Sequence, residues 1–498
     1  MTLARSIGGR IRLAGMAAGA LAMVMAAPQA ALARADAAAR PNVIVIVTDD
    51  QGYRDVGFNG SPDIPTPNID RIAREGVRFT RGYVAFPVCA PSRAGLLTGR
   101  YPARFGFDRN PNGDPTDPKG GVPRSELMLS EALKAAGYGT KAIGKWHMGT
   151  HPTLRPRVRG FDEFYGFIEG GHGYMPGQAK MEDISQSKVI YDWYYTKLID
   201  NGVKVDFKKY LTEEFSDRAV EYVDRMATAD KPFFLYLAYN APHAPLQVTD
   251  KYLNRFPNVT NPKRRAYMAM ISAVDDGVGQ VLQELDKRGI AKDTVVFFLS
   301  DNGGVTNHDT GEQPVADNAP LRGGKSQLFE GGVRVPFAVR WPGRIAGGRD
   351  YTRPVSSLDI FGTLAGEMGL HTLPRQPLDG VNLVPYLAGT TRGDPHPALF
   401  WRKYDQHQGA MVVGDLKYLA TPQGTAAYNL RSDVAETTDV SKQNAATMVK
   451  LDELYGAWAK QMAPRPAFPP LGTWPAKAAP KVAPAAGATP APEGEGGQ

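Results

Sequence analysis

The chain has 498 residues, of which 42% are apolar and 22% charged, as expected for a soluble protein with a large core and more than one domain. The formal net charge is +7; three of these charges lie in an amino-terminal segment that we expect to be removed, which leaves +4. No dense run of Lys and Arg with interleaved aromatic residues occurs, which argues against nucleic acid as a partner.

Residues 1–33 have the pattern of a secretory signal peptide. The basic residues at its start are Arg5, Arg10 and Arg12. An apolar stretch at 13–27 and a small-x-small cleavage site at 31–33 follow. The apolar stretch is short and consists mostly of Ala, Gly and Met, which favours cleavage over a membrane anchor. We therefore expect an exported protein, periplasmic or secreted, with no stable membrane anchor.

Four apolar runs predict buried strands, and each is followed by polar residues. They are 42–48 before Asp49 and Asp50, 140–143 before Lys145 and His147, 232–239 before His243, and 294–299 before Asp301 and Asn302. Amphipathic segments at 125–136, 211–226 and 264–285 predict helices between these strands. This alternation predicts an α/β fold with a mostly parallel sheet flanked by helices. Ligands bind beyond the carboxyl ends of such strands, so the polar residues should converge on one site.

After about residue 364 the segments shorten and turns multiply, which predicts a second, smaller α+β domain. Short strands are expected at 399–401, 409–413 and 417–419, and a helix at 446–461. From residue 464 the chain is rich in Pro and Ala, a composition typical of disorder. The predicted organisation is a signal peptide at 1–33, a catalytic domain at 41–364, the smaller domain at 365–463 and a disordered tail at 464–498.

Oxygen ligands stand at the ends of two predicted strands. Asp49, Asp50, Asp301 and Asn302 are hard ligands that suit Ca²⁺ or Mg²⁺, whereas a two-zinc phosphatase site would contain more His. The alternative is that these carboxylates only cap helices.

Cys89 is the only cysteine, so the chain can form no internal disulfide. It precedes a predicted helix at 92–98, whose N-terminus would favour an anion, and Arg93 adds a fixed positive charge. A lone thiol in an oxidising compartment is a liability unless it is buried, reactive or chemically converted. The alternative is a small apolar residue in the core.

The segment Cys89-Ala-Pro-Ser-Arg93, followed by Leu-Thr-Gly-Arg, resembles the signature of the sulfatases, whose cysteine is oxidised to formylglycine. Other segments resemble the same family in the same order. They are 144–149, 240–245, 318–325, 330–336, 357–360, 378–383 and 428–436. The resemblance covers roughly residues 41–460 and points to the arylsulfatase A and N-acetylgalactosamine-6-sulfatase type.

This resemblance implies an alkaline-phosphatase-like domain and a sulfuric ester hydrolase that cleaves sulfate monoesters, either aryl sulfates or sulfated sugars. The residues implied to hold one Ca²⁺ are Asp49, Asp50, Asp301, Asn302 and residue 89. Cys89, converted to a formylglycine hydrate, would be the nucleophile, and a formylglycine-generating enzyme would be a partner during maturation. The residues implied to bind sulfate oxygens are Arg93, Lys145 and Lys325. His243 would be the acid for the leaving alcohol, and His147 the base for release of sulfate.

Two other functions stay open: a phosphatase or phosphonate monoester hydrolase of the same superfold, and a non-catalytic protein that binds sulfate esters. Asn302 and the three cations favour a sulfatase over the first, and the complete set of catalytic positions argues against the second. Asp275 and Asp276 lie within a predicted helix, which favours a structural role.

The aromatic residues at 191–195 have two possible roles. The aromatic residues Tyr191, Trp193, Tyr194 and Tyr195 would either pack in the core or stack on a substrate ring. The roles of His172, His308 and His396, the physiological substrate and the oligomeric state stay open.

Overall fold

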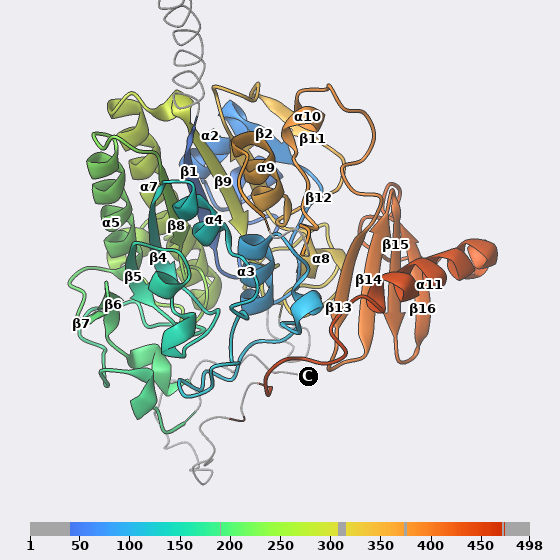
Figure 1. The fold of residues 1–498 in the computed structure, drawn as a ribbon, viewed down its shortest axis with the longest axis horizontal. Helices are drawn as coiled ribbons and strands as arrows, with labels where there is room; N and C mark the ends of the chain where they lie inside the picture. The colour runs from blue at the N-terminus through green and yellow to red at the C-terminus, as the bar shows by residue number, and fades with distance from the viewer. Residues whose placement is uncertain (1–39, 190, 307–314, 373–375, 471–472, 474–498) are drawn as a thin grey trace, which may run out of the picture. The chain divides into compact units, whose positions relative to one another are not determined.

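The computed structural model describes residues 40–189, 191–306, 315–372, 376–470 and 473. The predicted signal peptide and His308 lie outside these ranges. The described residues from Asn42 onward form one compact unit, built around a ten-stranded sheet (Figure 1).

The centre of this sheet is parallel. β1 (Asn42–Thr48) lies between β8 (Phe233–Ala238) and β9 (Thr294–Ser300), and β4 (Gly139–Lys145) lies on the other side of β8. The full order is β11-β2-β10-β9-β1-β8-β4-β5-β6-β7, with antiparallel pairs only towards the two ends. The remaining strands of this sheet are β2 (Val77–Phe79), β5 (Glu163–Phe167), β6 (Leu198–Asp200), β7 (Val203–Val205), β10 (Phe337–Arg340) and β11 (Arg349–Tyr351). The predicted mostly parallel sheet is confirmed.

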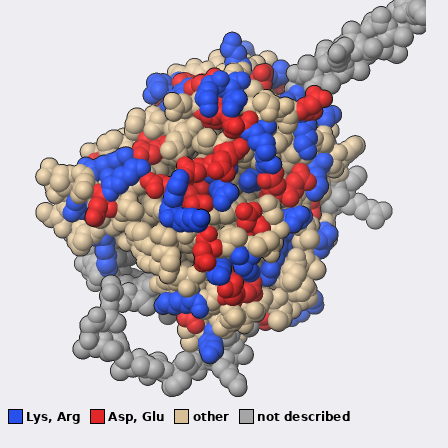
Figure 2. All heavy atoms as spheres, turned by 90° about the vertical axis from the view of Figure 1, so that its left-hand side faces the viewer, with Lys and Arg blue, Asp and Glu red and all other residues tan. Residues whose placement is uncertain are grey.

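Helices cover both faces of the sheet, because alternate residues of the central strands face two separate cores. In β1, Val43, Val45 and Val47 belong to one core and Ile44 and Ile46 to the other. The helices over the valine face are α3 (Cys89–Thr98), α4 (Leu129–Ala135) and α9 (Asp359–Met368). Those over the isoleucine face are α2 (Pro67–Glu75), α5 (Leu211–Met226) and α7 (Pro262–Lys287). On the side of the molecule that carries α5 and α7, basic and acidic side chains are intermingled (Figure 2).

A smaller antiparallel sheet follows. Its strands are β13 (Leu399–Lys403), β14 (Gln408–Val413), β15 (Leu416–Thr421) and β16 (Gly424–Asn429), in that order. Met411, Tyr418 and Ala427 face α11 (Ala445–Ala459), while the opposite face packs on the large unit. The three predicted strands and the predicted helix are present, and β16 was not predicted. The other short elements are β3 (Gly82–Tyr83), α6 (Asp250–Leu253), α8 (Glu330–Val333), β12 (Val355–Ser356) and α10 (Val384–Leu387).

Two predicted boundaries need correction. The division at residue 364 falls inside α9, and Leu383 and Leu387 still belong to a core of the large sheet. Disorder from residue 464 is wrong for residues 464–470, because Phe468 is 4% exposed and packs on Phe107 with ring centroids 5.0 Å apart. Except for Thr473, the rest of the predicted tail lies outside the described residues. Across the described ranges, no helix combines the length and apolarity needed to cross a bilayer.

Candidate active site

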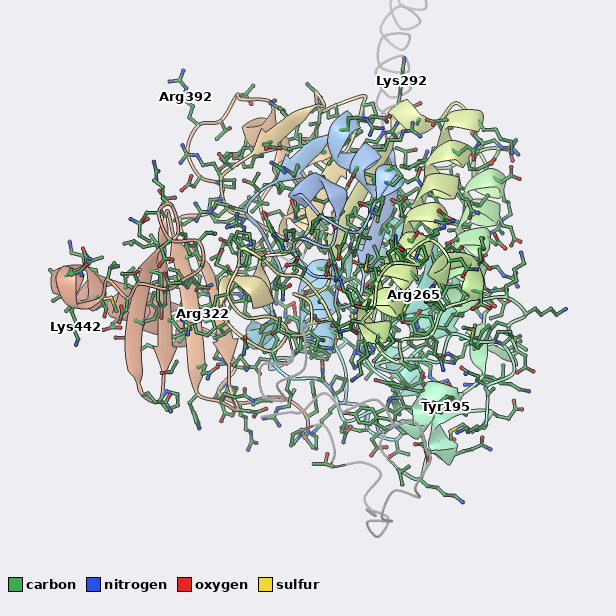
Figure 3. All side chains as sticks on the ribbon, turned by 180° about the vertical axis from the view of Figure 1, so that it is seen from behind. Tyr195, Arg265, Lys292, Arg322, Arg392 and Lys442 are labelled. Atoms are coloured by element: carbon green, nitrogen blue, oxygen red, sulfur yellow. The ribbon has the colours of Figure 1, made fainter. Side chains whose placement is uncertain are left out.

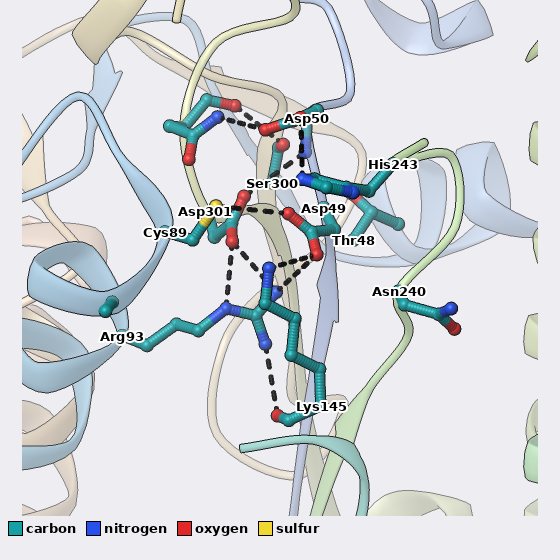
Figure 4. A network of polar contacts seen from close by, with 12 residues as sticks. Thr48, Asp49, Asp50, Cys89, Arg93, Lys145, Asn240, His243, Ser300 and Asp301 are labelled. Atoms are coloured by element: carbon teal, nitrogen blue, oxygen red, sulfur yellow. Dashed lines mark hydrogen bonds and ion pairs between the residues drawn. The ribbon is translucent and has the colours of Figure 1, made fainter. Parts of the chain in front are cut away.

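The polar residues that follow the central strands meet at one edge of the sheet. Thr48 at the end of β1 pairs with Ser300 at the end of β9, so Asp49 and Asp301 leave neighbouring strands at the same level. Lys145 is the last residue of β4, two strands from β1. Figure 4 shows the resulting network of buried side chains. The prediction that the strand ends converge is confirmed.

The acidic side chains form a compact oxygen-rich cluster. Ligand atoms of Asp49, Asp50, Asp301 and Cys89 all lie within 4.8 Å of one another, and all four residues are buried. Asn302 Nδ2 donates to Asp50 Oδ1 at 2.7 Å. The other amide atom, Asn302 Oδ1, is buried and has no hydrogen-bond partner among the described residues. A buried oxygen without a donor, beside three carboxylates, fits a hard cation such as Ca²⁺.

Three cations neutralise these carboxylates. Lys145 Nζ lies 2.6 Å from Asp49 Oδ2 and Arg93 Nε lies 2.8 Å from Asp301 Oδ2. Lys325 Nζ lies 2.8 Å from Asp50 Oδ2, so each of the three carboxylates has a cation within 2.8 Å, and Arg93 Nη2 also lies 3.6 Å from Asp49 Oδ2. All of these side chains are at least 94% buried, which strengthens their mutual attraction.

Burial and charge act in opposite directions on the carboxyl pKa values. Burial would raise the pKa of Asp49, but the positive charges of Lys145, His243 and Arg93 outweigh it and hold this pKa below its ordinary value. Burial and the charge of Asp49 raise the pKa of Asp301 to about 6, although Arg93 opposes the shift. The surrounding positive charges therefore keep Asp49 ionised.

Cys89 is the first residue of α3 rather than a residue before the helix, which corrects the predicted start at 92. Its Sγ lies 3.4 Å from Asp49 Oδ1, and the adjacent Ala90 N–H donates to Asn110 Oδ1. Burial and the charge of Asp49 raise the pKa of the Cys89 thiol well above its ordinary value. A protonated thiol is a poor nucleophile, so unmodified cysteine does not suit nucleophilic chemistry at this position.

Three residues in this region have backbone conformations that are rare for residues other than glycine. Asp50, His147 and Ser326 have φ values of 64°, 58° and 69°, a region that non-glycine residues rarely occupy. The Tyr267 hydroxyl lies 3.0 Å from the Asp50 carbonyl and accepts a hydrogen bond from Gly52 N–H, which holds the Asp50 turn. The surrounding structure thus stabilises conformations that these residues would not adopt alone.

The two histidines occupy different surroundings. His243 Nδ1 donates to the Ala244 carbonyl at 2.7 Å, which leaves Nε2 facing Asp50 Oδ2 at 3.6 Å. His147 lines a small cavity together with Glu169, Tyr194 and Asn110, and Asn110 accepts the hydrogen bond from Ala90 N–H next to Cys89. Burial raises the pKa of Glu169 to about 7, with Lys204 opposing. The Tyr194 ring also lies edge-on to His243, with centroids 6.4 Å apart.

The other candidates are structural. Both ring nitrogens of His172 lie within 2.8 Å of backbone carbonyls. His396 pairs with the buried Asp359 at 2.7 Å. Asp275 accepts hydrogen bonds from the N–H groups of Asn68 and Ile69 at the start of α2, which agrees with the structural role favoured from the sequence.

Of the predicted aromatic cluster, Trp193 and Tyr194 are each 4% exposed and packed in the core, although both also line the cavity beside His147. Tyr191 and Tyr195 pack against that core while partly exposed. Core packing therefore dominates for this cluster.

Several residues of the site were not predicted. They are Asn110, Glu169, Tyr267 and Ser300, whose hydroxyl accepts from Gln51 N–H. Tyr267 lies on a predicted helix face and Asn110 in a loop, so no local pattern distinguished them. Only Ser300, directly before Asp301, had a sequence signal.

Comparison with known proteins identifies the family of this chain. The model of the family described as Sulfatase matches residues 41–370, which is more than half of the chain. This chain belongs to the sulfatase family. The sulfatase is 37% identical over 354 residues to N-acetylgalactosamine-6-sulfatase of Mus musculus, and the match covers 69% of this chain and 66% of that protein. The chain therefore spans just under two thirds of that relative.

Solved structures share the fold. The structure named Ps i-CgsB has a TM-score of 0.81 and 39% sequence identity to this sulfatase, and the match covers 87% of this chain and 96% of that chain. That protein was also solved in complex with k-i-k-neocarrahexaose. The phosphonate monoester hydrolase of Agrobacterium radiobacter has a TM-score of 0.60 and 22% identity, and it covers 85% of this chain and 96% of its own. The latter likeness concerns the fold alone.

Proposed function

We propose that this sulfatase hydrolyses sulfate monoesters, with a formylglycine made from Cys89 and one Ca²⁺ held by Asp49, Asp50, Asp301 and Asn302. The observation that carries the proposal is the buried cluster in which three carboxylates and Cys89 Sγ lie within 4.8 Å of one another. When bound, the ion would polarise sulfate oxygens and the converted side chain would supply the nucleophilic oxygen. The raised pKa of the Cys89 thiol makes the unmodified residue a poor nucleophile, so the proposal assigns the nucleophilic role to the converted side chain.

Arg93, Lys145 and Lys325 would stabilise the sulfate group. In the described structure each is close to one carboxylate, so a divalent cation among the carboxylates would make the cluster positive. A sulfate ester carries negative charge, which spreads over its oxygens in the transition state. Fixed cations aimed at those oxygens lower the barrier without reorganisation.

His243 would donate the proton to the leaving alcohol. Its Nδ1–H is engaged by the Ala244 carbonyl, so Nε2 is the atom that faces the site. Nε2 lies 3.6 Å from Asp50 Oδ2, so a proton on this atom would be at the edge of the carboxylate cluster. We assign the role of base in sulfate release to His147, which lines the adjacent cavity.

The substrate class that we propose is a sulfated sugar. The names of relatives support the same class, since one is an N-acetylgalactosamine-6-sulfatase and another was solved with an oligosaccharide. Aryl sulfates are convenient probes of the same chemistry.

Maturation and location complete the proposal. A formylglycine-generating enzyme would convert Cys89, and the amino-terminal segment at 1–33 would direct export to the periplasm or the medium. The Cys89 motif and the residue pattern of 1–33 support these two assignments.

The test compares kcat/KM on 4-nitrophenyl sulfate, phosphate and phosphonate esters, for the wild type and Cys89→Ala produced with a formylglycine-generating enzyme. We expect the sulfate to be preferred and Cys89→Ala to be inactive. Preference for phosphate or phosphonate would reassign the protein to that hydrolase class. Binding of sulfate esters without turnover, in fully converted protein, would support a non-catalytic role instead.

A further inference from the structure

The loop that carries Lys325 lies between the large sheet and the smaller sheet. It runs from Arg322 to the start of α8, and its Leu328 is 3% exposed in a core shared with Leu399, Trp401 and other residues of the smaller sheet. Figure 1 places α8 beside β13, and Figure 3 places Arg322 at the border of the smaller sheet. The position of this loop therefore depends on residues from both sheets.

Ser326, the residue after Lys325, is held from both sides. Its N–H donates to the Pro87 carbonyl at 2.8 Å, two residues before Cys89. Its carbonyl accepts a hydrogen bond from Lys403 Nζ, on β13, at 2.5 Å. These two contacts fix a residue whose φ of 69° is unfavourable without support.

Three further contacts hold the ends of the loop. The Glu436 carboxylate accepts a hydrogen bond from Glu330 N–H at 2.6 Å, and the Glu436 carbonyl accepts one from Arg322 Nη1 at 2.9 Å. Lys417 Nζ, on β15, lies 2.8 Å from Glu330 Oε1, and both side chains are fully buried. Lys417 of the smaller sheet and Glu436, in the segment that follows β16, thus hold the loop on both sides of Lys325.

The surroundings of Lys403 are unusual for a lysine with only a structural role. It is 7% exposed, and within the parts of the chain that the structure describes it forms no ion pair with an acidic side chain. Burial lowers the pKa of Lys403 to about 8, with the charge of Asp405 opposing. A buried amine that meets only a neutral carbonyl costs stability, which an apolar side chain would not.

We propose that the smaller sheet is part of the catalytic apparatus, and that Lys403 is a positioning residue that sets Lys325 against Asp50 through the Ser326 carbonyl. The inference rests on the proposed role of Lys325 in sulfate binding. It makes the smaller sheet necessary for turnover even though none of its residues belongs to the predicted site.

The test is a double-mutant cycle between Lys325→Met and Lys403→Met, with rates normalised to formylglycine content. Lys403→Met should lower kcat/KM for an aryl sulfate by on the order of 10- to 100-fold, because small misplacements of binding groups have effects of that size. In the Lys325→Met background it should add little, because it acts through Lys325. Lys403→Arg, which retains a donor, should recover most of the activity.

Stability and a surface control separate positioning from misfolding. Lys403→Met should melt at or above the wild-type temperature, since it removes a buried amine without a carboxylate partner. Lys450→Met, at an exposed position of α11, should behave as the wild type in all assays. Unchanged kcat/KM in Lys403→Met, or losses that multiply in the double variant, would overturn the positioning role alone. Full activity of Lys325→Met would overturn both this inference and the proposed role of Lys325.

Discussion

Replacement of Lys417 by Met should destabilise the protein, and more so at alkaline pH. Lys417 is fully buried between Glu330 Oε1 at 2.8 Å and Glu436 Oε1 at 3.6 Å. Removing one partner of a buried ion pair costs about 3–5 kcal/mol, because the remaining charge is left uncompensated. Lys417→Met leaves two buried carboxylates, and among the described residues Arg334 is the one remaining cation paired with either of them, at Glu330. The loss should therefore reach this range when both carboxylates are ionised.

The pH dependence follows from Glu436. Burial raises its pKa to about 7, and the charge of Glu330 adds to this shift while Lys417 opposes it. A carboxyl group whose pKa is raised on folding stabilises the folded state below its unfolded pKa, and this contribution is lost as pH rises through the folded pKa. Without Lys417 the pKa of Glu436 should rise further. The variant should therefore lose less stability at pH 6, where Glu436 can take up a proton, than at pH 8.

The assay is the melting temperature of wild type and variant at pH 6 and pH 8, at one scan rate, because a protein of this size need not unfold reversibly. Lys442→Met, at an exposed position beside α11, is the matched control and should not differ from the wild type. Equal melting temperatures for Lys417→Met and wild type, or a larger loss at pH 6 than at pH 8, would refute this reasoning.

Three further outcomes are expected. Chelation of Ca²⁺ should abolish turnover and lower the melting temperature. Addition of Ca²⁺ at 100 times its Kd should restore about 2.7 kcal/mol of unfolding free energy. A melting temperature that responds to neither treatment would argue against a calcium site. His243→Ala should lose more kcat on esters with poor leaving groups than on aryl esters, and an equal loss on both would remove it as the acid. Phe468→Ala should cost about 3–5 kcal/mol in unfolding free energy, because it empties a buried ring site against Phe107, whereas an unaffected denaturation curve would place Phe468 outside the core.

The central strands and the residues that follow them could be predicted because the signal is local. A continuous β-branched run such as 42–48 suits a strand buried on both faces, and Asp49 and Asp50 follow it directly. The helix predicted at 92–98 begins three residues earlier, at Cys89. Pro91 is accepted in its first turn, because the N–H groups there have no partner within the helix.

Other features could not be predicted because they depend on residues far apart in the chain. Lys403 meets Ser326 across 77 positions, and Glu436 meets Glu330 across 106, so no local pattern indicates either contact. β16 has few large apolar residues, and its pairing with β15 defines it. A Pro-rich composition indicates disorder on average, but Phe468 packs in the core and Ala467 N–H donates to the Gly106 carbonyl, and these contacts hold the start of the segment.

The central claim is that residue 89 acts as a formylglycine rather than as a cysteine. Mass spectrometry of the tryptic peptide Gly82–Arg93, from protein purified from its native host, tests this claim most directly. The account predicts the mass of the aldehyde residue, or of its hydrate, in active protein. An unmodified cysteine in protein that still cleaves sulfate esters would contradict it.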